Sequence, residues 1–434
     1  MGPGSGPGVR SPTPIEQAHG VTEFDFTDGS RLVVKASEFS PGTASVAGLI
    51  GSGRLGLSPP LAGSSWATAF LPLGGTAWGS YEQIEHWLNA SGHSVQLNFT
   101  PETRAFHFSG TSSTADLGYQ VALLCGIARH PAVGDSVLKK SGQFGTVLNA
   151  QIDSNPGLVF SRAVQRAVSG LGPRYSEFPV KAEVNAGGPN GLDQIVQSGV
   201  SGPIDMAVVG DVNPAAVAAV FRDRCAQDGF TGHSRATVPI HASFQPGKHV
   251  WTFVQADRKS QPPADGVFWS TAVYGRGERH RLALDVLADV LKVRVSLARS
   301  RTSSRVVPIT GSFQGYPSDS FGYFGLGLEA EAVPPGGIEP FVRGELDRLL
   351  HDTQFDAQVK AVLDARVGPG KASLLSNTKW AETLAESLTE PAALDRLLLF
   401  NPPTLQSAVE DARNAAIWLG QEGSVAVIEV HPRT

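Results

Sequence analysis

Residues 203–225 read PIDMAVVGDVNPAAVAAVFRDRC, and this segment decides the fold. Its apolar, β-branched run predicts a buried strand, and Gly210-Asp211 predicts the turn that ends the strand. Asn213 and Pro214 suit the N-cap and the first position of a helix, because the N–H groups there have no partner within the helix. The segment therefore predicts a buried strand that closes a domain, followed at once by a helix.

A second buried strand, GSVAVIEVHP, lies at residues 423–432 and follows a helix-like stretch at 405–420. The segments 104–133 and 321–350 also correspond, because each reads as a strand, a turn and a long amphipathic helix. Strands alternate with helices, but the connections include hairpin-like steps. These patterns predict an α+β fold of two similar tandem domains, each a mainly antiparallel sheet packed with helices.

Composition suggests the domain limits. Gly, Pro and Ser dominate residues 1–18, which predicts a flexible linker or tag. A boundary near residue 235 gives a first domain at 19–235 and a second at 236–434. The start does not combine a basic segment with an apolar run, so it predicts no secretory signal, and periplasm and cytoplasm both stay open as compartments.

Charge and hydropathy exclude two classes of partner. A formal net charge of −5 does not favour nucleic acid, which requires a basic face. We expect no transmembrane segment, because no run approaches the ~18 apolar residues that a helical span needs. Cys125 and Cys225 lie a hundred residues apart in helix-like segments. That spacing fits neither a disulfide framework nor a zinc knuckle, so we interpret both as small buried thiols.

Four stretches, at 26–39, 74–110, 206–214 and 257–291, resemble one half of the insulinase/pitrilysin metallopeptidases and occur in that family's order. The resemblance implies a clamshell of two homologous halves, each of two α+β domains, of which one half carries zinc. Residues 31–60 look most similar to the start of the zinc-free, C-terminal half of long bacterial members. This chain would then be half of such a clamshell.

In the active half of that family an HxxEH motif lies on a helix. Its histidines bind Zn²⁺ and its glutamate acts as general base on the zinc-bound water. With Gly75-Thr76 as the anchor, the three motif positions in this chain are Trp66, Ala69 and Phe70. None of these side chains binds zinc or accepts a proton, so the resemblance implies an inactive half.

The family's further zinc ligand, a glutamate, is also missing. Its expected place lies within residues 142–157, which contain Asn149, Ala150 and Gln151 but no glutamate. We therefore predict no metal bound by this chain, and expect zinc in an active partner half.

A near match to the motif, EQIEH, occupies residues 82–86. The structural interpretation is preferred, because Ser80 and Gln83 can form a capping box at the start of a helix. The predicted buried stripe of that helix is Ile84, Trp87 and Leu88. The residues predicted to face solvent are Glu82, Glu85 and His86. The isolated histidines His107 and His280 are interpreted as satisfied or exposed side chains rather than ligands.

The zinc-free half of the family supplies an arginine and, seven residues later, a tyrosine that contact the peptide or its oxyanion. Arg299 matches the arginine, but the tyrosine position is Val306, so the pair is half present. Arg301, Arg305 or Tyr316 could substitute for the tyrosine. The alternative is a solvated basic loop without a substrate role.

The resemblance thus implies a catalytically inactive half of a zinc metalloendopeptidase, which completes the substrate chamber and assists peptide binding. Its expected partner is an active HxxEH-bearing half or subunit, or a second copy of the chain in its absence. The alternative is a non-enzymatic scaffold or assembly protein derived from the peptidase fold. Whether the chain is a whole subunit or a fragment of a longer protein stays open.

Overall fold

The computed structural model describes residues 20–76, 78–170, 172–174, 176–186, 189–225, 243–254, 263–271, 278–298, 306–313, 321–390, 392–398 and 402–433. The chain divides into two compact units, and each collects segments from distant parts of the sequence. Unit 1 is Met1–Thr146, Ala182–Val238 and Ala372–Leu397, and unit 2 is Val147–Lys181, Pro239–Lys371 and Leu398–Thr434. The predicted linker at 1–18 and the predicted boundary near 235 lie outside the described residues, so the domain limits stay a prediction.

Unit 1 contains a six-stranded sheet in the order β1-β2-β6-β3-β5-β4. Every neighbouring pair is antiparallel except β2 and β6, which run parallel. The strands are β1 Val21–Asp25, β2 Arg31–Ala36, β3 Thr43–Ile50, β4 Asn98–Pro101, β5 Phe106–Ser113 and β6 Ile204–Gly210.

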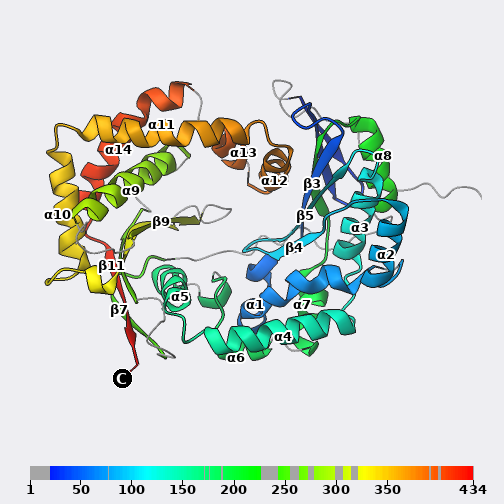
Figure 1. Cartoon of the computed structure of the whole chain (residues 1–434), viewed down its shortest axis with the longest axis horizontal. Coiled ribbons are helices and arrows are strands. Elements are labelled where there is room, and N and C mark those ends of the chain that lie inside the picture. The colour runs from blue at the N-terminus through cyan, green and yellow to red at the C-terminus, as the bar shows by residue number, and fades with distance from the viewer. Residues whose placement is uncertain are drawn as a thin grey trace, which may run out of the picture. The chain divides into compact units, whose positions relative to one another are not determined.

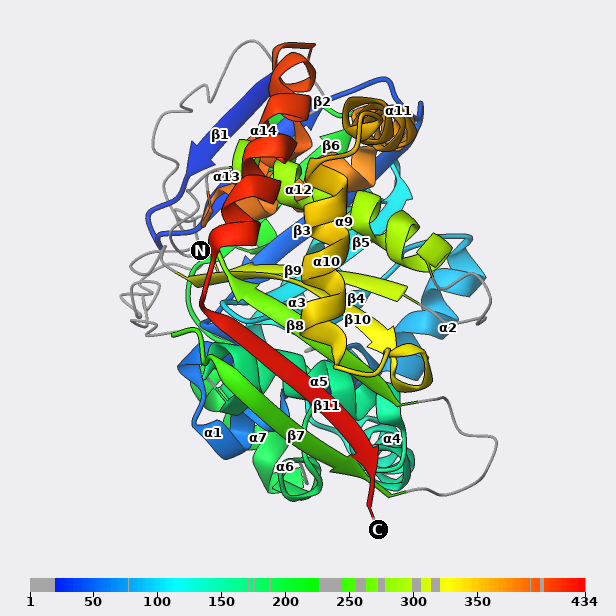
Figure 2. The same ribbon diagram turned by 90° about the vertical axis from the view of Figure 1, so that its left-hand side faces the viewer.

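Unit 2 contains a five-stranded sheet in the order β7-β11-β8-β10-β9. Its one parallel pair is β7 with β11. The strands are β7 Gly247–Phe253, β8 Ala264–Ser270, β9 Val306–Phe313, β10 Phe321–Glu329 and β11 Val425–Pro432. Figure 2 shows β11, in red, between β7 and β8.

The two sheets share one topology. In each, the last strand enters between a parallel neighbour and an antiparallel neighbour, so β2-β6-β3-β5-β4 matches β7-β11-β8-β10-β9. The predicted correspondence of the closing strands is therefore seen in the structure. Two mainly antiparallel sheets with helices also confirm the predicted α+β fold class.

The segment at 203–225 folds as its sequence predicts. Every residue of β6 is buried, and a turn at Asp211 leads into α8. The side chain of Asn213 accepts a hydrogen bond from the Ala216 N–H at 3.0 Å, and Pro214 is the first helical residue. The N-cap thus satisfies one of the N–H groups that the first turn leaves without a partner.

The helices lie on both faces of the sheets (Figure 1). Those in the first half of the chain are η2 Gly53–Gly56, α1 Pro59–Gly63, η3 Ser65–Gly74, α2 Tyr81–Ser91, α3 Leu117–Arg129, α4 Asp135–Gln151, α5 Pro156–Ser169, η4 Gly172–Arg174, α6 Lys181–Ala186, α7 Pro189–Gly199 and α8 Pro214–Arg224. Those in the second half are α9 Glu278–Ala298, η5 Ala330–Ala332, α10 Ile338–Leu350, α11 Phe355–Ser373, α12 Asn377–Ser387, α13 Ala392–Leu397 and α14 Pro402–Gln421.

Each half of the sequence contributes one helix to the sheet that is formed by the other half. The α12 helix lies between β10 and β11 in the chain, yet it packs on β3 and β6 of unit 1. The α5 helix lies between β5 and β6 in the chain, yet it packs on β7, β8 and β11 of unit 2. Each sheet is therefore covered on one face by a helix from the other half of the sequence.

Each sheet also buries an aromatic ring directly on a glycine of the neighbouring strand. Gly48 pairs with Phe108, and a Cβ atom at Gly48 would lie 2.3 Å from the Phe108 ring. Gly325 pairs with Phe268, and a Cβ atom at Gly325 would also lie 2.3 Å from the ring. No larger side chain fits at either position unless the ring moves, so these glycines are explained by close packing.

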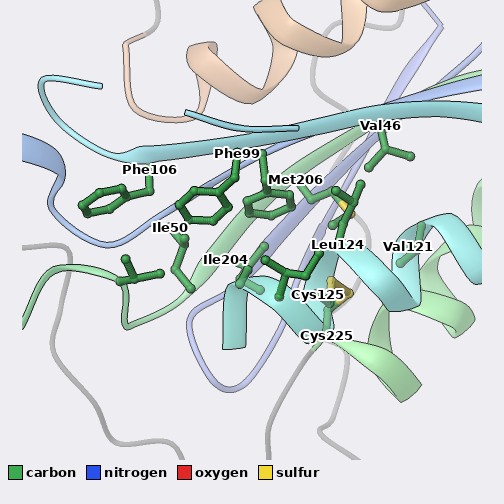
Figure 3. Packing of buried hydrophobic residues seen from close by; sticks show 14 of the residues in the cluster. Val46, Ile50, Phe99, Phe106, Val121, Leu124, Cys125, Ile204, Met206 and Cys225 are labelled. Atoms are coloured by element: carbon green, nitrogen blue, oxygen red, sulfur yellow. A yellow bond between two sulfur atoms is a disulfide. The ribbon is translucent and has the colours of Figure 1, made fainter. Parts of the chain in front are cut away.

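The apolar core of unit 1 lies between its sheet and the helix pair α3 and α8 (Figure 3). Cys125 on α3 and Cys225 at the end of α8 form a disulfide across this pair, with their Cα atoms 5.2 Å apart. Beside it, Arg129 donates to the Cys225 carbonyl at 3.0 Å and forms a buried ion pair with Asp28 at 2.9 Å. Both cysteines are buried as predicted, but the interpretation as separate thiols is wrong, because folding joins helices that the sequence keeps a hundred residues apart.

Replacement of Cys125 and Cys225 by alanine is expected to lower the free energy of unfolding by ~2–5 kcal/mol, because the cross-link restricts a long loop in the unfolded chain. Urea unfolding of the natural chain and the double variant measures the difference. The same reductant added to both proteins is the control, since it should destabilise only the natural chain. Two reactive thiols per chain, titrated in denaturant without reductant, would contradict the disulfide.

Candidate functional site

The helix that carries the motif positions is a 3₁₀ helix, η3, rather than an α-helix. In an α-helix positions i and i+4 share one face, which is what HxxEH requires. In a 3₁₀ helix positions i and i+3 lie above each other, and i+4 is turned away by about 120°. Trp66 and Phe70 therefore do not have the relation of two zinc ligands on one helix face.

Aromatic rings occupy the region around these positions. Phe144, on α4, lies with its ring centroid 5.5 Å from Trp66 and 5.7 Å from Phe70. The indole of Trp66 also packs on the backbone of Gly145, where an added Cβ atom would lie 3.1 Å from the ring. Ala69 is exposed beside this cluster. The side chains around the motif positions make apolar contacts, and none of them supplies a ligand atom for zinc.

The expected place of the distal glutamate falls on the last turn of α4, where Asn149 is half-buried and Ala150 and Gln151 are exposed. Within the described residues, no group of three or more His, Cys, Asp and Glu side chains is arranged to hold a metal ion. That this chain binds no metal ion stays a prediction.

The EQIEH segment lies in the first half of α2, and Glu82, Glu85 and His86 are exposed as predicted. The capping box is present, because Ser80 accepts from the Gln83 N–H at 3.3 Å and the Gln83 side chain accepts from the Ser80 N–H at 2.9 Å. The helix is therefore held by its cap as the sequence predicts.

The predicted stripe of α2 is wrong at Trp87, whose side chain is 43% exposed. Leu88 is buried and Ile84 is half-buried. The Trp87 ring packs instead on the rings of His93, at 5.3 Å, and Tyr119, at 5.0 Å. Helical periodicity could not predict these contacts, because His93 follows the helix and Tyr119 lies on α3.

The face of the unit 1 sheet under α12 is polar. Ser45 and Thr378 share a hydrogen bond of 3.0 Å, and the Lys35 ammonium lies 4.7 Å from the centre of the Trp380 ring. Burial lowers the pKa of Lys35. These contacts explain how a largely apolar sheet also holds a polar layer: α12 supplies partners for groups that would otherwise be buried alone.

At one end of this layer, Arg31 on β2 forms a two-pronged ion pair with Asp205 on β6. The two contacts are 2.9 Å from Nε and 3.0 Å from Nη2. Arg31 also donates to the carbonyl of Leu388, after the end of α12. The pair thus connects the parallel strands β2 and β6 to the helix that covers them.

His107 lies on β5 on this same face, where Glu382 of α12 is its charged neighbour. Burial lowers the pKa of His107, and Glu382 raises it by a smaller amount. His280 lies in the first turn of α9 and is half-buried. No third ligand accompanies either histidine in the described part of the chain.

Most of the residues predicted to contact substrate lie outside the described part of the chain. Arg299, Arg301, Arg305 and Tyr316 lie outside the described residues. Val306 is the first residue of β9, and its side chain is also outside the described part. The substrate role of Arg299 therefore stays a prediction.

A groove of about 510 Å³ opens in unit 1 between α2, η3 and β4. Ala69, one of the three motif positions, lines its floor, and Glu85 and His93 line its polar side. Sequence reasoning missed this groove, although it brings together the motif segment and the near-match helix. No local pattern in the sequence indicates the groove, because β4 becomes the end strand only when the sheet has assembled.

No protein-family model matches the chain, and no curated protein matches it. Solved structures do match over nearly its whole length. A protease from Helicobacter pylori has a TM-score of 0.74 and 14% identity, over 94% of this chain and 99% of that one. The peptidase M16 inactive domain from Pseudomonas fluorescens has a TM-score of 0.72 and 15% identity, over 95% of this chain and 98% of that one.

Two longer proteins match as well. The periplasmic protease PqqL from Escherichia coli has a TM-score of 0.73 and 13% identity, over 98% of this chain and 47% of that one. The ferredoxin protease FusC, solved as a mutant in complex with Arabidopsis ferredoxin, has a TM-score of 0.69 and 17% identity, over 99% of this chain and 47% of that one. The chain therefore spans about half the length of these two proteins.

These likenesses establish the fold. The chain has the fold of one half of an M16 peptidase, and one protein with this fold is described as an inactive domain. The predicted resemblance to an insulinase-type half is thus confirmed for the architecture. Among the described helices, none is both long and apolar enough to cross a membrane.

Replacing Trp66 by His, Ala69 by Glu and Phe70 by His together is expected not to create a zinc site, because the 3₁₀ form of η3 turns the two introduced histidines away from each other. Elemental analysis after dialysis against zinc should give near zero zinc per chain for the natural protein and the triple variant. The matched control is His86→Ala, which should not change the result. One zinc per chain, lost in His86→Ala, would place a metal site on α2 instead.

The lowered pKa of His107 makes stability depend on pH. The unfolded chain binds a proton at His107 more readily than the folded chain, so stability should fall as pH drops below the ordinary imidazole pKa of ~6.5. His107→Gln should remove this component, so its stability relative to the natural chain should rise from about pH 8 to about pH 5. Urea unfolding at both pH values measures it, and a pH-independent difference would contradict the assignment.

Proposed function

We propose that this chain is the zinc-free half of a zinc metalloendopeptidase of the insulinase/pitrilysin type. It would complete the substrate chamber and assist peptide binding when it pairs with an active, HxxEH-bearing half. The observation that carries the proposal is the M16 half fold combined with Trp66, Ala69 and Phe70 at the motif positions. An apolar cluster at the motif positions is compatible with the fold but supplies neither a zinc ligand nor a general base.

The partner half can be a separate subunit or part of the same polypeptide. Similar structures support both arrangements. The Pseudomonas fluorescens domain matches this chain over 98% of its own length, which supports a separate subunit. PqqL matches over 47% of its length, which supports one half of a longer polypeptide. A second copy of this chain is the partner to consider if no active half is found. In every case we place the zinc in the active half and none in this chain.

The proposed contribution is enclosure. A second half that covers the peptide excludes bulk water, and electrostatic interactions at the zinc site become stronger in the drier chamber. Arg299 is proposed to add a hydrogen-bond donor for the peptide or its oxyanion. FusC, which shares this fold, was solved in complex with Arabidopsis ferredoxin.

The test is reconstitution. A tagged chain is used to isolate a partner that contains HxxEH, and both proteins are then purified and mixed. We expect hydrolysis of an internally quenched peptide to require both proteins and to be lost when a chelator removes zinc. The control is a partner whose motif glutamate is replaced by glutamine, which should assemble without activity.

Arg299→Ala in the reconstituted pair separates the two candidate functions. A substrate role predicts a fall in kcat on the order of 100-fold with assembly unchanged, as for removal of an oxyanion donor. Arg222→Ala is the matched control, because Arg222 is a surface arginine on α8 paired with Asp223. The scaffold function replaces the peptidase function if the chain assembles with its partner but turnover is the same without the chain and with the Arg299→Ala variant.

A further inference from the structure

The two sheets share one topology but differ at one edge. In unit 1, β1 covers the outer edge of β2 and runs antiparallel to it. The strand of unit 2 that matches β2 is β7, which is the end strand of its sheet (Figure 2). Among the described strands of unit 2, none takes the place that β1 has in unit 1.

The main-chain groups of β7 alternate between the two sides of the strand. The carbonyl of Phe253 accepts from the Arg433 N–H at 2.7 Å, on the side of β11. The N–H of the next residue, Val254, donates to the Asp153 carbonyl at 2.6 Å, on the other side. Because successive residues of a strand point their N–H and C=O groups to opposite sides, the even-numbered residues of β7 point away from β11.

Three residues of β7 therefore carry outward main-chain groups. They are Lys248, Val250 and Thr252, and no described residue is hydrogen-bonded to their outward N–H and C=O groups. The side chain of Val250 is 56% exposed. The open edge thus covers residues 248–252 and ends at Val254, where Asp153 already occupies the N–H.

The open edge has little protection by charge. Proteins commonly protect such an edge with charged side chains or proline, but β7 reads GKHVWTF and Lys248 is its one lysine, arginine or acidic residue. The Lys248 ammonium lies 2.7 Å from Glu429 Oε1 on the neighbouring strand β11. Its charge is therefore compensated within its own sheet, and the remaining residues of the edge favour strand pairing.

A second copy of β7 fits this edge. The pairing of β1 with β2 shows that an antiparallel strand fits the matching edge of unit 1, and a two-fold axis brings two identical strands together antiparallel. With the axis at Val250, each Val250 lies opposite its copy and each Lys248 lies opposite Thr252. This register gives partners to the outward groups of all three residues, and no like charges lie directly opposite each other.

We propose that two copies of this chain associate through β7, in antiparallel register, with Val250 on the two-fold axis. The two five-stranded sheets then join at their β7 edges. Main-chain hydrogen bonds give affinity, and the two-fold axis closes the interface because each copy uses its own open edge. The contact is small, so the dimer is weak and reversible. The inference goes beyond the proposed function, which concerns the pairing with an active half.

Sedimentation equilibrium of the full chain tests the interface. A weak dimer forms only at high protein concentration, so the series reaches about 1 mM. We expect a monomer–dimer equilibrium for the natural chain. Val250→Lys places two positive charges opposite each other and should weaken the dimer about fivefold or more. Val250→Pro removes an N–H that only the second copy uses, and should abolish the dimer.

Val293→Lys is the matched control. Val293 is also an exposed valine of unit 2, at 53%, but it lies on α9 rather than on the sheet. The control should dimerise like the natural chain. Thermal unfolding followed by circular dichroism verifies that each variant is folded, because substitutions at an exposed edge should leave the monomer stable.

The register has its own test at Thr252, which faces Lys248 of the second copy in the proposed pairing. Thr252→Glu should strengthen the dimer about three- to tenfold at low salt, because two opposite-charge pairs form across the axis. Thr252→Lys should weaken it by a similar factor. Equal effects of the two substitutions would reject this register.

Three further results would overturn the proposal. The first is a natural chain that stays monomeric at the highest concentration. The second is a dimer that keeps its affinity in both Val250→Lys and Val250→Pro, because another surface then forms it. The third is a chain that is monomeric alone while Val250→Lys dissociates its complex with an active half, because the edge then binds that partner instead of a second copy.

Discussion

The insertion of the last strand into the middle of each sheet is the constraint on which the structure depends. All seven residues of β6 are buried, so both faces of the strand must be covered. In unit 1 the core with α3 and α8 covers one face, and α12 covers the other. In unit 2 the inserted strand β11 contacts α5, which likewise comes from the other half of the sequence. The exchanged helices thus follow from a strand that is central in space but last in its half.

Local features of the fold could be predicted from the sequence because their causes are local. Asn213 caps α8 and Ser80 caps α2, and in each the partners lie within three residues. The packing of α12 on β3 could not be predicted in this way, because nothing near either segment indicates the other. The disulfide between Cys125 and Cys225 has the same origin: its geometry exists only after α3 and α8 pack together.

The candidate site shows the same limit. The side chains at Trp66, Ala69 and Phe70 could be assigned by resemblance, and their chemistry excludes zinc binding without further geometry. The 3₁₀ form of η3 and the contact of Phe144 with Trp66 depend on packing between η3 and α4. The prediction that Trp87 is buried was wrong for a related reason, since its contacts come from side chains outside its own helix. Periodicity indicates which face of a helix is apolar but not which neighbour covers it.

The exchange of α5 and α12 also sets the order in which the chain can fold. During synthesis, β1 to β6 leave the ribosome long before α12 does, so the polar face of the first sheet has no cover until residue 387 has been made. The chain therefore cannot fold domain by domain with the N-terminal unit completed first. Contacts between residues more than three hundred positions apart, such as Ser45 with Thr378, make the topology one of high contact order. Each unit can therefore be completed only after the C-terminal part of the chain has been made, because unit 1 needs α12 and unit 2 needs β11.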